Sequence, residues 1–435
     1  MKRITLFALM AAFFVCCLAA QQLTELRRAI SYSVRDSVDK VGNQYISYWG
    51  QLSPVFIFIN NDGSVTLCSS NESAKITYIY EYDIDFKEQN AWAVQNELGS
   101  LGAFTKDNEG NYYFFYAAKT TNKNSENMAM VKCNLERKKI RIYKLKAQAP
   151  NSYDGVMNPY DKGTCRLELS GSMLAVYFAR EMFNGRQSSY GFVLDKNTFE
   201  RIDEGAATNA QIIGGNMQMP YVSHSFNQFI LPIDNGFIFA DHGDAYPRSF
   251  TFAKFQKGSD TKRLNAFTFP AVENVVSATY AEMGGLAKTS GGYIFAGVYG
   301  KDRNSARNLF VLTFDEELNS CSEPIYLTKY AKNESHAGHP KIAKVDTDRY
   351  MILWEVFKFS MQSPDIIERS ATDYVSTYML LIDEKGKAVS EPRELSGIRL
   401  NMSDTLRYNP KNGKVYWAIN NSKTSLSIYA LGKEK

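Results

Sequence analysis

The stretch HSFNQFILPIDNGFIFADHGDAYPR, residues 224–248, decides the fold and holds two of the chain's four histidines. Its centre is an apolar run, a tight polar turn at PIDNG, and a second apolar run, FIFADH. A turn of Asp, Asn and Gly between two β-favouring runs is typical of a β-hairpin. We therefore expect two antiparallel strands, which bring His224 and His242 together at the end away from the turn.

The same hairpin layout recurs along the chain. Five further stretches share it: TKDNEGNYYFFYAA (105–118), LSGSMLAVYFAR (169–180), KTSGGYIFAGVYG (288–300), VDTDRYMILWEV (345–356) and NPKNGKVYWAIN (409–420). A third alternating strand follows most hairpins, for example SYGFVLDKNTF or NLFVLTFDEEL. The period is about 55 to 65 residues, which indicates a repeat architecture built from four-stranded units.

This repeat resembles the blades of the β-propeller superfamily. The resemblance implies an all-β, seven-bladed propeller, although six or eight blades also fit the count. The last unit shows three strands, and we expect NQYISYW (residues 43–49) to supply its fourth. Closure by strands from both ends of the chain would bury two exposed sheet edges. The predicted domains are a signal peptide (1–20), an N-terminal helical segment (21–42) and the propeller (43–435).

The first twenty residues, MKRITLFALMAAFFVCCLAA, have a basic start, an apolar run and small residues at the end. This pattern predicts a secretory signal peptide, because the run is too short to span a bilayer. We expect an exported protein, in the periplasm, at the cell surface or outside the cell. No later segment is apolar enough to cross a membrane, so a tether would require lipid attachment at Cys17.

Composition favours β structure and excludes one class of partner. The chain contains 27 Tyr and 27 Phe, which suit pleated, half-buried surfaces. Its net charge is +4 without a basic block, so nucleic acid is not an expected partner. The four cysteines after residue 20 are far apart in the sequence, and both disulfides and free thiols remain open.

Strand order predicts where polar residues gather. In each antiparallel unit the first strand begins, and the second ends, on the same face of the ring. His224 and His242 should share that face with Asp244, Tyr246 and Arg248. Other units should add a second group of side chains to it: Arg180, Glu181, Arg186, His336, His339, Trp354 and Glu355.

The function predicted from these residues is binding. The protein would bind a glycan, a small molecule or another protein on this face, and an anionic glycan suits the guanidinium groups. The alternative is an enzyme, because the fold and the paired histidines with Tyr and Arg resemble the propeller-type polysaccharide lyases. That resemblance implies that Arg248 or Arg180 binds a carboxylate, while His224, His242 or Tyr246 exchanges a proton.

A metal site built from all four histidines is a third hypothesis. The HAGH pair at residues 336–339 has neither of the usual metal-ligand spacings, so we predict no metal. No phosphate-binding loop or nucleophile motif is present in the sequence, and the cofactor stays unknown.

Overall fold

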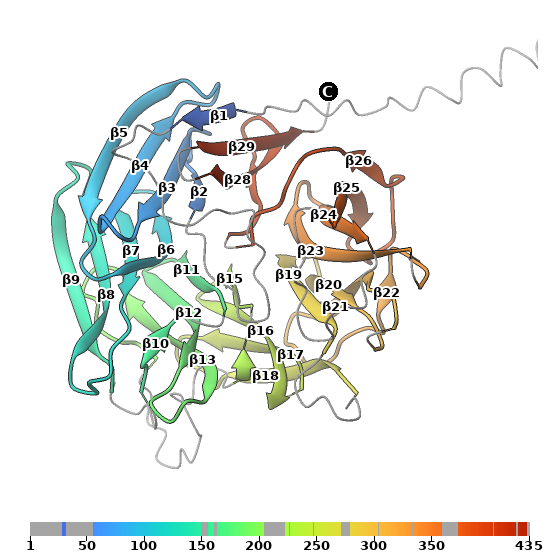
Figure 1. The fold of residues 1–435 in the computed structure, drawn as a ribbon, viewed down its shortest axis with the longest axis horizontal. Coiled ribbons are helices and arrows are strands. Elements are labelled where there is room, and N and C mark those ends of the chain that lie inside the picture. The colour runs from blue at the N-terminus through green and yellow to red at the C-terminus, as the bar shows by residue number, and fades with distance from the viewer. Residues whose placement is uncertain are drawn as a thin grey trace, which may run out of the picture.

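The fold is all-β, as the sequence predicted. The computed structural model describes residues 28–31, 55–148, 155–160, 163–203, 222–225, 227–246, 248–270, 279–302, 304–332, 334–358, 373–402, 404–422 and 425–432. Regular structure in these ranges consists of strands, and no helix occurs among them. The strands form antiparallel sheets arranged around a common centre (Figure 1).

Four sheets, within the ranges given above, contain four strands each in chain order. The first two comprise β2 (Val55–Ile59), β3 (Val65–Asn71), β4 (Ile76–Tyr82) and β5 (Glu88–Gln95), then β6 (Ser100–Lys106), β7 (Tyr112–Ala117), β8 (Glu126–Cys133) and β9 (Lys139–Lys146). The other two comprise β19 (Ala281–Lys288), β20 (Gly292–Tyr299), β21 (Asn308–Asp315) and β22 (Ile325–Tyr326), then β23 (Ser335–Lys344), β24 (Arg349–Lys358), β25 (Tyr374–Asp383) and β26 (Arg393–Leu395).

A larger sheet of nine strands contains two such units joined side by side. Its strands are β10 (Asn158–Pro159), β11 (Cys165–Ser170), β12 (Met173–Glu181), β13 (Gln187–Asp195), β14 (Ser223–Ser225), β15 (Phe229–Ile233), β16 (Gly236–Tyr246), β17 (Ser249–Gln256) and β18 (Lys262–Thr268). The short strand β14 pairs with both β13 and β16 and thereby joins the units. It lies at the start of the stretch that opened the sequence analysis.

The last sheet combines strands from both ends of the chain. It contains β27 (Arg407–Asn409), β28 (Lys414–Ser422), β29 (Ser425–Gly432) and β1 (Arg28–Ser31). β1 pairs antiparallel with β29, so Arg28–Ser31 is a strand within the segment where the sequence predicted a helix. Residues 43–49, which we expected to fill this edge, lie outside the described residues.

All six predicted hairpins are confirmed: β6–β7, β11–β12, β15–β16, β19–β20, β23–β24 and β27–β28. The first strand of each unit lies innermost, and each inner strand contacts the next around the centre, in the order β2, β6, β11, β15, β19, β23, β27 and back to β2. Charged side chains on these strands therefore meet near the centre of the molecule.

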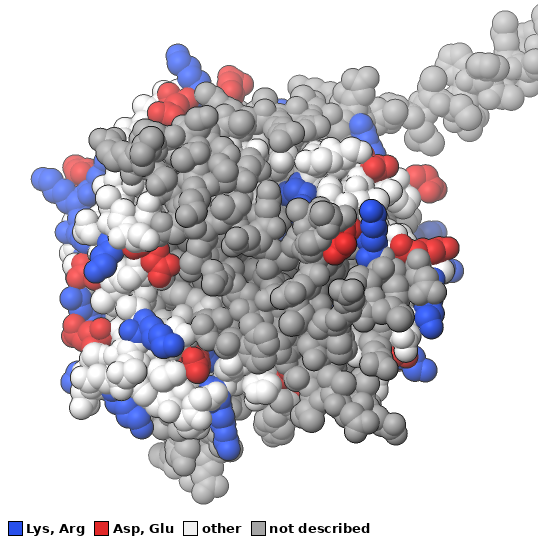
Figure 2. Space-filling view, viewed as in Figure 1, with Lys and Arg blue, Asp and Glu red and all other residues white. Residues whose placement is uncertain are grey.

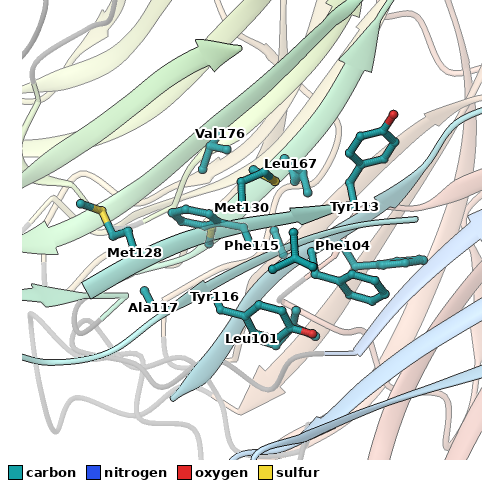
Figure 3. Packing of buried hydrophobic residues seen from close by; sticks show 14 of the residues in the cluster. Leu101, Phe104, Tyr113, Phe115, Tyr116, Ala117, Met128, Met130, Leu167 and Val176 are labelled. Carbon is teal, nitrogen blue, oxygen red and sulfur yellow. The ribbon is translucent and has the colours of Figure 1, made fainter. Parts of the chain in front are cut away.

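Aromatic side chains fill the spaces between neighbouring sheets. In Figure 3, Phe115 from β7 lies with Met130 beside Val176 and Leu167 of the next unit. The Phe115 ring is 5.5 Å from that of Phe178. Each buried side chain of this size contributes about 1.5–3 kcal/mol. The high Phe and Tyr content thus stabilises contacts between sheets.

The described cysteines Cys68, Cys133, Cys165 and Cys321 are free thiols. Three of them are buried, and burial raises the pKa of Cys68 and Cys165 well above the ordinary value. The sequence was compatible with disulfides or free thiols, and in the structure these four cysteines are free thiols.

Candidate functional site

The strongest candidate site is built around His224 on β14. Pairing of Ser223 with Tyr246 and of Ser225 with Gly243 sets His224 beside the end of β16. Its Nδ1 atom lies 3.0 Å from Oδ1 of the fully buried Asp244, while the imidazole side chain is 36% exposed. The carboxylate of Asp244 beside the ring raises the pKa of His224, so the protonated ring is favoured.

Two arginines share this end of the sheet with His224. Arg248 is held by the main chain, because its Nη1 donates to the Asp244 carbonyl at 2.7 Å and its Nε to the Pro270 carbonyl at 3.2 Å. Arg186 is exposed in the β12–β13 turn, two residues before Ser188, which pairs with Ser223. We call Arg186, His224 and Arg248 the β14 rim.

Tyr246 was predicted beside this group. Its main chain pairs with Ser223, but its side chain lies outside the described residues.

His242 is a buried residue of the core. Its Nε2 lies 2.7 Å from Thr279 Oγ1, and its ring packs edge-on against Phe250 and Phe269. Burial, with repulsion from Arg248 and Arg307, lowers the pKa of His242 to about 3. His242 therefore stays neutral at ordinary pH and lies against apolar rings, which suits a structural side chain better than a proton carrier.

This lowered pKa predicts acid sensitivity. Between pH 6.5 and 3 the unfolded chain binds a proton at His242 that the folded protein does not bind. Stability from this group is therefore complete above pH 6.5 and is lost as pH falls, by about 1.4 kcal/mol per pH unit. We expect His242→Gln to have a shallower decline than the wild type in urea unfolding at pH 7, 6, 5 and 4.

His224→Gln is the control for this series, since the pKa of His224 is raised. The stabilisation from His224 is complete below pH 6.5 and disappears as pH rises through its folded-state pKa, so this variant should change the curve on the alkaline side. Identical slopes for His242→Gln and wild type below pH 6.5 would contradict the assignment.

A second carboxylate, Asp241, anchors β14 from inside, and sequence reasoning missed it. Ser225 Oγ donates to it at 2.7 Å, Tyr177 OH at 2.8 Å and the His242 main-chain NH at 2.7 Å. Burial raises the pKa of Asp241 to about 7 despite these hydrogen bonds. β14 is thus fixed by carboxylates three residues apart on β16, through His224 and Ser225.

His339, in the middle of β23, and Glu355, three residues before the end of β24, form a buried pair. Nδ1 of His339 lies 2.7 Å from Glu355 Oε2. Arg399 donates to both carboxylate oxygens at 2.9 and 3.3 Å, and the Leu400 NH donates at 2.8 Å. Both carboxylate oxygens of Glu355 therefore have partners within the protein. They connect β24 to β23 and to the loop at residues 399–400, so Glu355 does not face a ligand.

His336 is half-buried and accepts a hydrogen bond from the Arg307 main-chain NH at its Nδ1, over 3.0 Å. Arg307 also lies 3.8 Å from Glu282, whose other carboxylate oxygen accepts the His339 NH at 2.6 Å. Arg307 and Glu282 thus contact His336 and His339, respectively, from the neighbouring unit.

Trp354 and Arg180 occupy the core, which corrects the expectation that they face a ligand. Trp354 is 1% exposed, stacks on Tyr378 and donates its indole NH to Tyr330 OH at 3.1 Å. Arg180 is fully buried and donates to the Gly155 carbonyl at 2.8 Å and to Ser188 Oγ at 3.0 Å. Glu181, at the end of β12, is half-buried.

A group of charged residues at the inner strands was also missed. Arg166 of β11, Lys341 of β23 and Asp404, which precedes β27, are all buried. The only available sequence signal was a charge in an otherwise apolar first strand, as in CRLELS and in SHAGHPKIAK. Strand periodicity assigns such residues to a strand, but it does not predict which residues of another unit they contact.

No group of three or more His, Cys, Asp or Glu side chains arranged to hold a metal occurs among the described residues. Helices able to span a membrane are likewise absent from the part of the chain that the structure describes. Figure 2 shows acidic and basic residues interspersed around the rim of one face. Surface charge in this view is therefore mixed.

Neither a protein-family model nor a curated protein matches the sequence. Solved structures that the chain is similar to include a member of the DUF4221 family from Bacteroides vulgatus, with a TM-score of 0.45 and 11% identity over 94% of this chain and 97% of that one. A PL25 ulvan lyase bound to -[GlcA(1-4)Rha3S]- has a TM-score of 0.45 and 13% identity over 78% and 80%. The β-propeller domain of the Trilobed protease from Pyrococcus furiosus has a TM-score of 0.39 and 9% identity over 80% and 82%.

Proposed function

We propose that the protein is an exported propeller that binds an anionic ligand, of the acidic-glycan class, at the β14 rim. The His224–Asp244 contact carries this proposal. A buried carboxylate holds the imidazole in place and favours its protonated form, while part of the ring stays exposed.

The cations of the rim complement one another. Arg248 is oriented by two main-chain carbonyls, so less side-chain freedom is lost when it binds a carboxylate or sulfate. Arg186 is exposed on the neighbouring turn. An acidic sugar chain would present several anionic groups to such a rim at once.

In the same proposal the scaffold is a seven-bladed propeller. The nine-stranded sheet counts as two blades that β14 joins, and β1 completes the blade of β27–β29. The order of contacts between inner strands supports seven units in a ring. Export is tested by following the full chain and a chain lacking residues 1–20 through cell fractionation.

Binding to a panel of uronic-acid and sulfated polysaccharides tests the function. We expect His224→Ala or Arg248→Ala to weaken binding of any polysaccharide that binds the wild type by about 10-fold or more, equivalent to about 1.4 kcal/mol. Affinity should also fall as pH rises through the His224 pKa, because the charge of the imidazolium is lost. His336→Ala, on another sheet, is the matched control. Unchanged affinity in both rim variants would refute the site.

Lyase activity is the second candidate, and the same contact favours it. A histidine oriented by a buried carboxylate is a common arrangement for general acid–base catalysis. Here His224 would exchange the proton and Arg248 would bind the uronate carboxylate. A rise in ultraviolet absorbance from unsaturated uronate during the same panel, lost in His224→Ala, would assign the lyase reaction, and a flat trace on all uronic polysaccharides would leave binding alone.

A further inference from the structure

We propose that the protein binds a neutral sugar residue in a cleft between the turns of its first two sheets. This site is separate from the β14 rim, and it does not depend on the function proposed for that rim. The turns of the cleft follow the first strands of their units, whereas the rim lies at the end of the second strand β16. The two sites therefore lie at opposite ends of the strands.

The cleft has a volume of about 560 Å³. It is lined by the β2–β3, β4–β5 and β6–β7 turns and the strand ends beside them. The two sheets that carry these turns are neighbours, and β6 contacts both β2 and β3 (Figure 1). Sites for small molecules ordinarily measure about 300–1,000 Å³, so the cleft is large enough for a sugar residue.

Phe58, near the end of β2, gives the cleft an apolar wall. Its side chain lines the cleft, is half-buried and packs against a hydrophobic core cluster. Within the described ranges, no other aromatic ring and no cation stacks on it. One face of a pyranose ring consists of C–H groups, and contact with an aromatic ring removes their apolar surface from water. Phe58 is therefore suited to contact that face of a sugar.

Polar side chains on the turns have hydrogen-bonding capacity left for a ligand. Asn61 and Asn108 line the cleft and are exposed, and neither carboxamide has a partner among the described residues. Asp62 Oδ1 accepts from the Ser64 NH at 2.9 Å and from Ser64 Oγ at 2.6 Å, which fixes the carboxylate and leaves acceptor sites on Oδ2. Sugar hydroxyls both donate and accept, so carboxamides and a carboxylate oxygen match them.

The charges at the cleft are paired, which favours an uncharged ligand. Lys106, the cation among the lining residues, lies 3.7 Å from Glu81 and 4.7 Å from the centroid of the Tyr112 ring. Asp83 and Asp107 accept hydrogen bonds from main-chain NH groups of their own turns. A uronate or sulfate group would therefore be repelled by these carboxylates, although it suits the rim.

Binding of the purified protein to dextran, mannan, galactan and arabinan tests the site. We expect at least one of these neutral polysaccharides to bind, and the double variant Asn61→Ala/Asn108→Ala to weaken that binding by about 10-fold through the lost hydrogen bonds. Both side chains are exposed, so this variant should fold as the wild type does. Phe58→Leu should also weaken binding, because the ring is lost. Asn319→Ala, at an exposed carboxamide between β21 and β22, is the matched control.

Two further measurements separate this site from the rim. Binding of the neutral polysaccharide should not change with sodium chloride concentration, because no ion pair forms, and Arg248→Ala should leave it unchanged. This result would stand even if the rim bound no acidic glycan. Absence of binding to every neutral polysaccharide of the panel would overturn the proposal, as would equal affinity of the double variant and the wild type. Binding of spermidine in their place, lost in the double variant, would indicate an amine site and would also overturn it.

Discussion

Glu355→Ala is expected to lower the free energy of unfolding by about 3–5 kcal/mol, the loss seen when one member of a buried ion pair is removed. The wild-type carboxylate accepts hydrogen bonds from Arg399 and from the Leu400 NH, and it contacts His339 at 2.7 Å. Alanine would leave the Arg399 guanidinium largely buried without this partner and would free the loop at residues 399–400. Urea unfolding at pH 7 measures the change.

Glu181→Ala is the matched control for Glu355. Glu181 lies on the second strand of its unit, as Glu355 does, but it is only half-buried. Its replacement should change stability by no more than about 0.5 kcal/mol, as is usual away from buried networks. A loss below about 1 kcal/mol for Glu355→Ala would mean that the Glu355 contacts contribute little to folding.

Trp354→Ala should cost about 3–5 kcal/mol through the cavity that it leaves between two units. The indole is 1% exposed, its ring centroid lies 5.6 Å from that of Tyr378, and its NH donates to Tyr330 OH at 3.1 Å. Polysaccharide binding by the folded variant should equal that of the wild type, because Trp354 does not contribute to the rim. Unfolding in urea and the polysaccharide panel check the two statements separately.

Two further variants bracket this result. Trp354→Phe keeps an aromatic ring on Tyr378 and should lose less than Trp354→Ala, since the removed volume is smaller. Val375→Ala, at a side chain that is 48% exposed, should change stability by about 0.5 kcal/mol or less. Weaker glycan binding by folded Trp354→Ala would contradict this assignment. It would support the sequence-based expectation that Trp354 belongs to the binding face.

Sequence patterns predicted the strands and hairpins because both depend on neighbours in the chain. Alternation of apolar residues and the turn chemistry of PIDNG act over a few positions, so β15 and β16 appear where the pattern sets them. The N-terminal region shows the limit of such patterns. Arg28–Ser31 lies in a segment with helical spacing, yet it pairs with β29, since an unpaired sheet edge favours another strand.

The candidate site was predictable only in part. His224 and the end of β16 are close in the sequence, so hairpin geometry brought them together correctly. The sequence did not distinguish Asp244, which contacts His224, from His242, which packs on Phe250. That choice depends on the direction in which each side chain leaves its strand, and a register shift between β14 and β16 changes it.

The sequence by itself determined that this protein is a repeat of antiparallel four-stranded units with polar residues at the strand ends. Only the tertiary structure decided which of these residues are exposed. Trp354 and Arg180 became core residues because neighbouring sheets cover them. Lys341 and Arg166 both lie near the Phe229 ring because inner strands far apart in the sequence are neighbours at the centre. Burial and long-range pairing depend on how whole sheets pack against one another, and a local sequence pattern does not predict that packing.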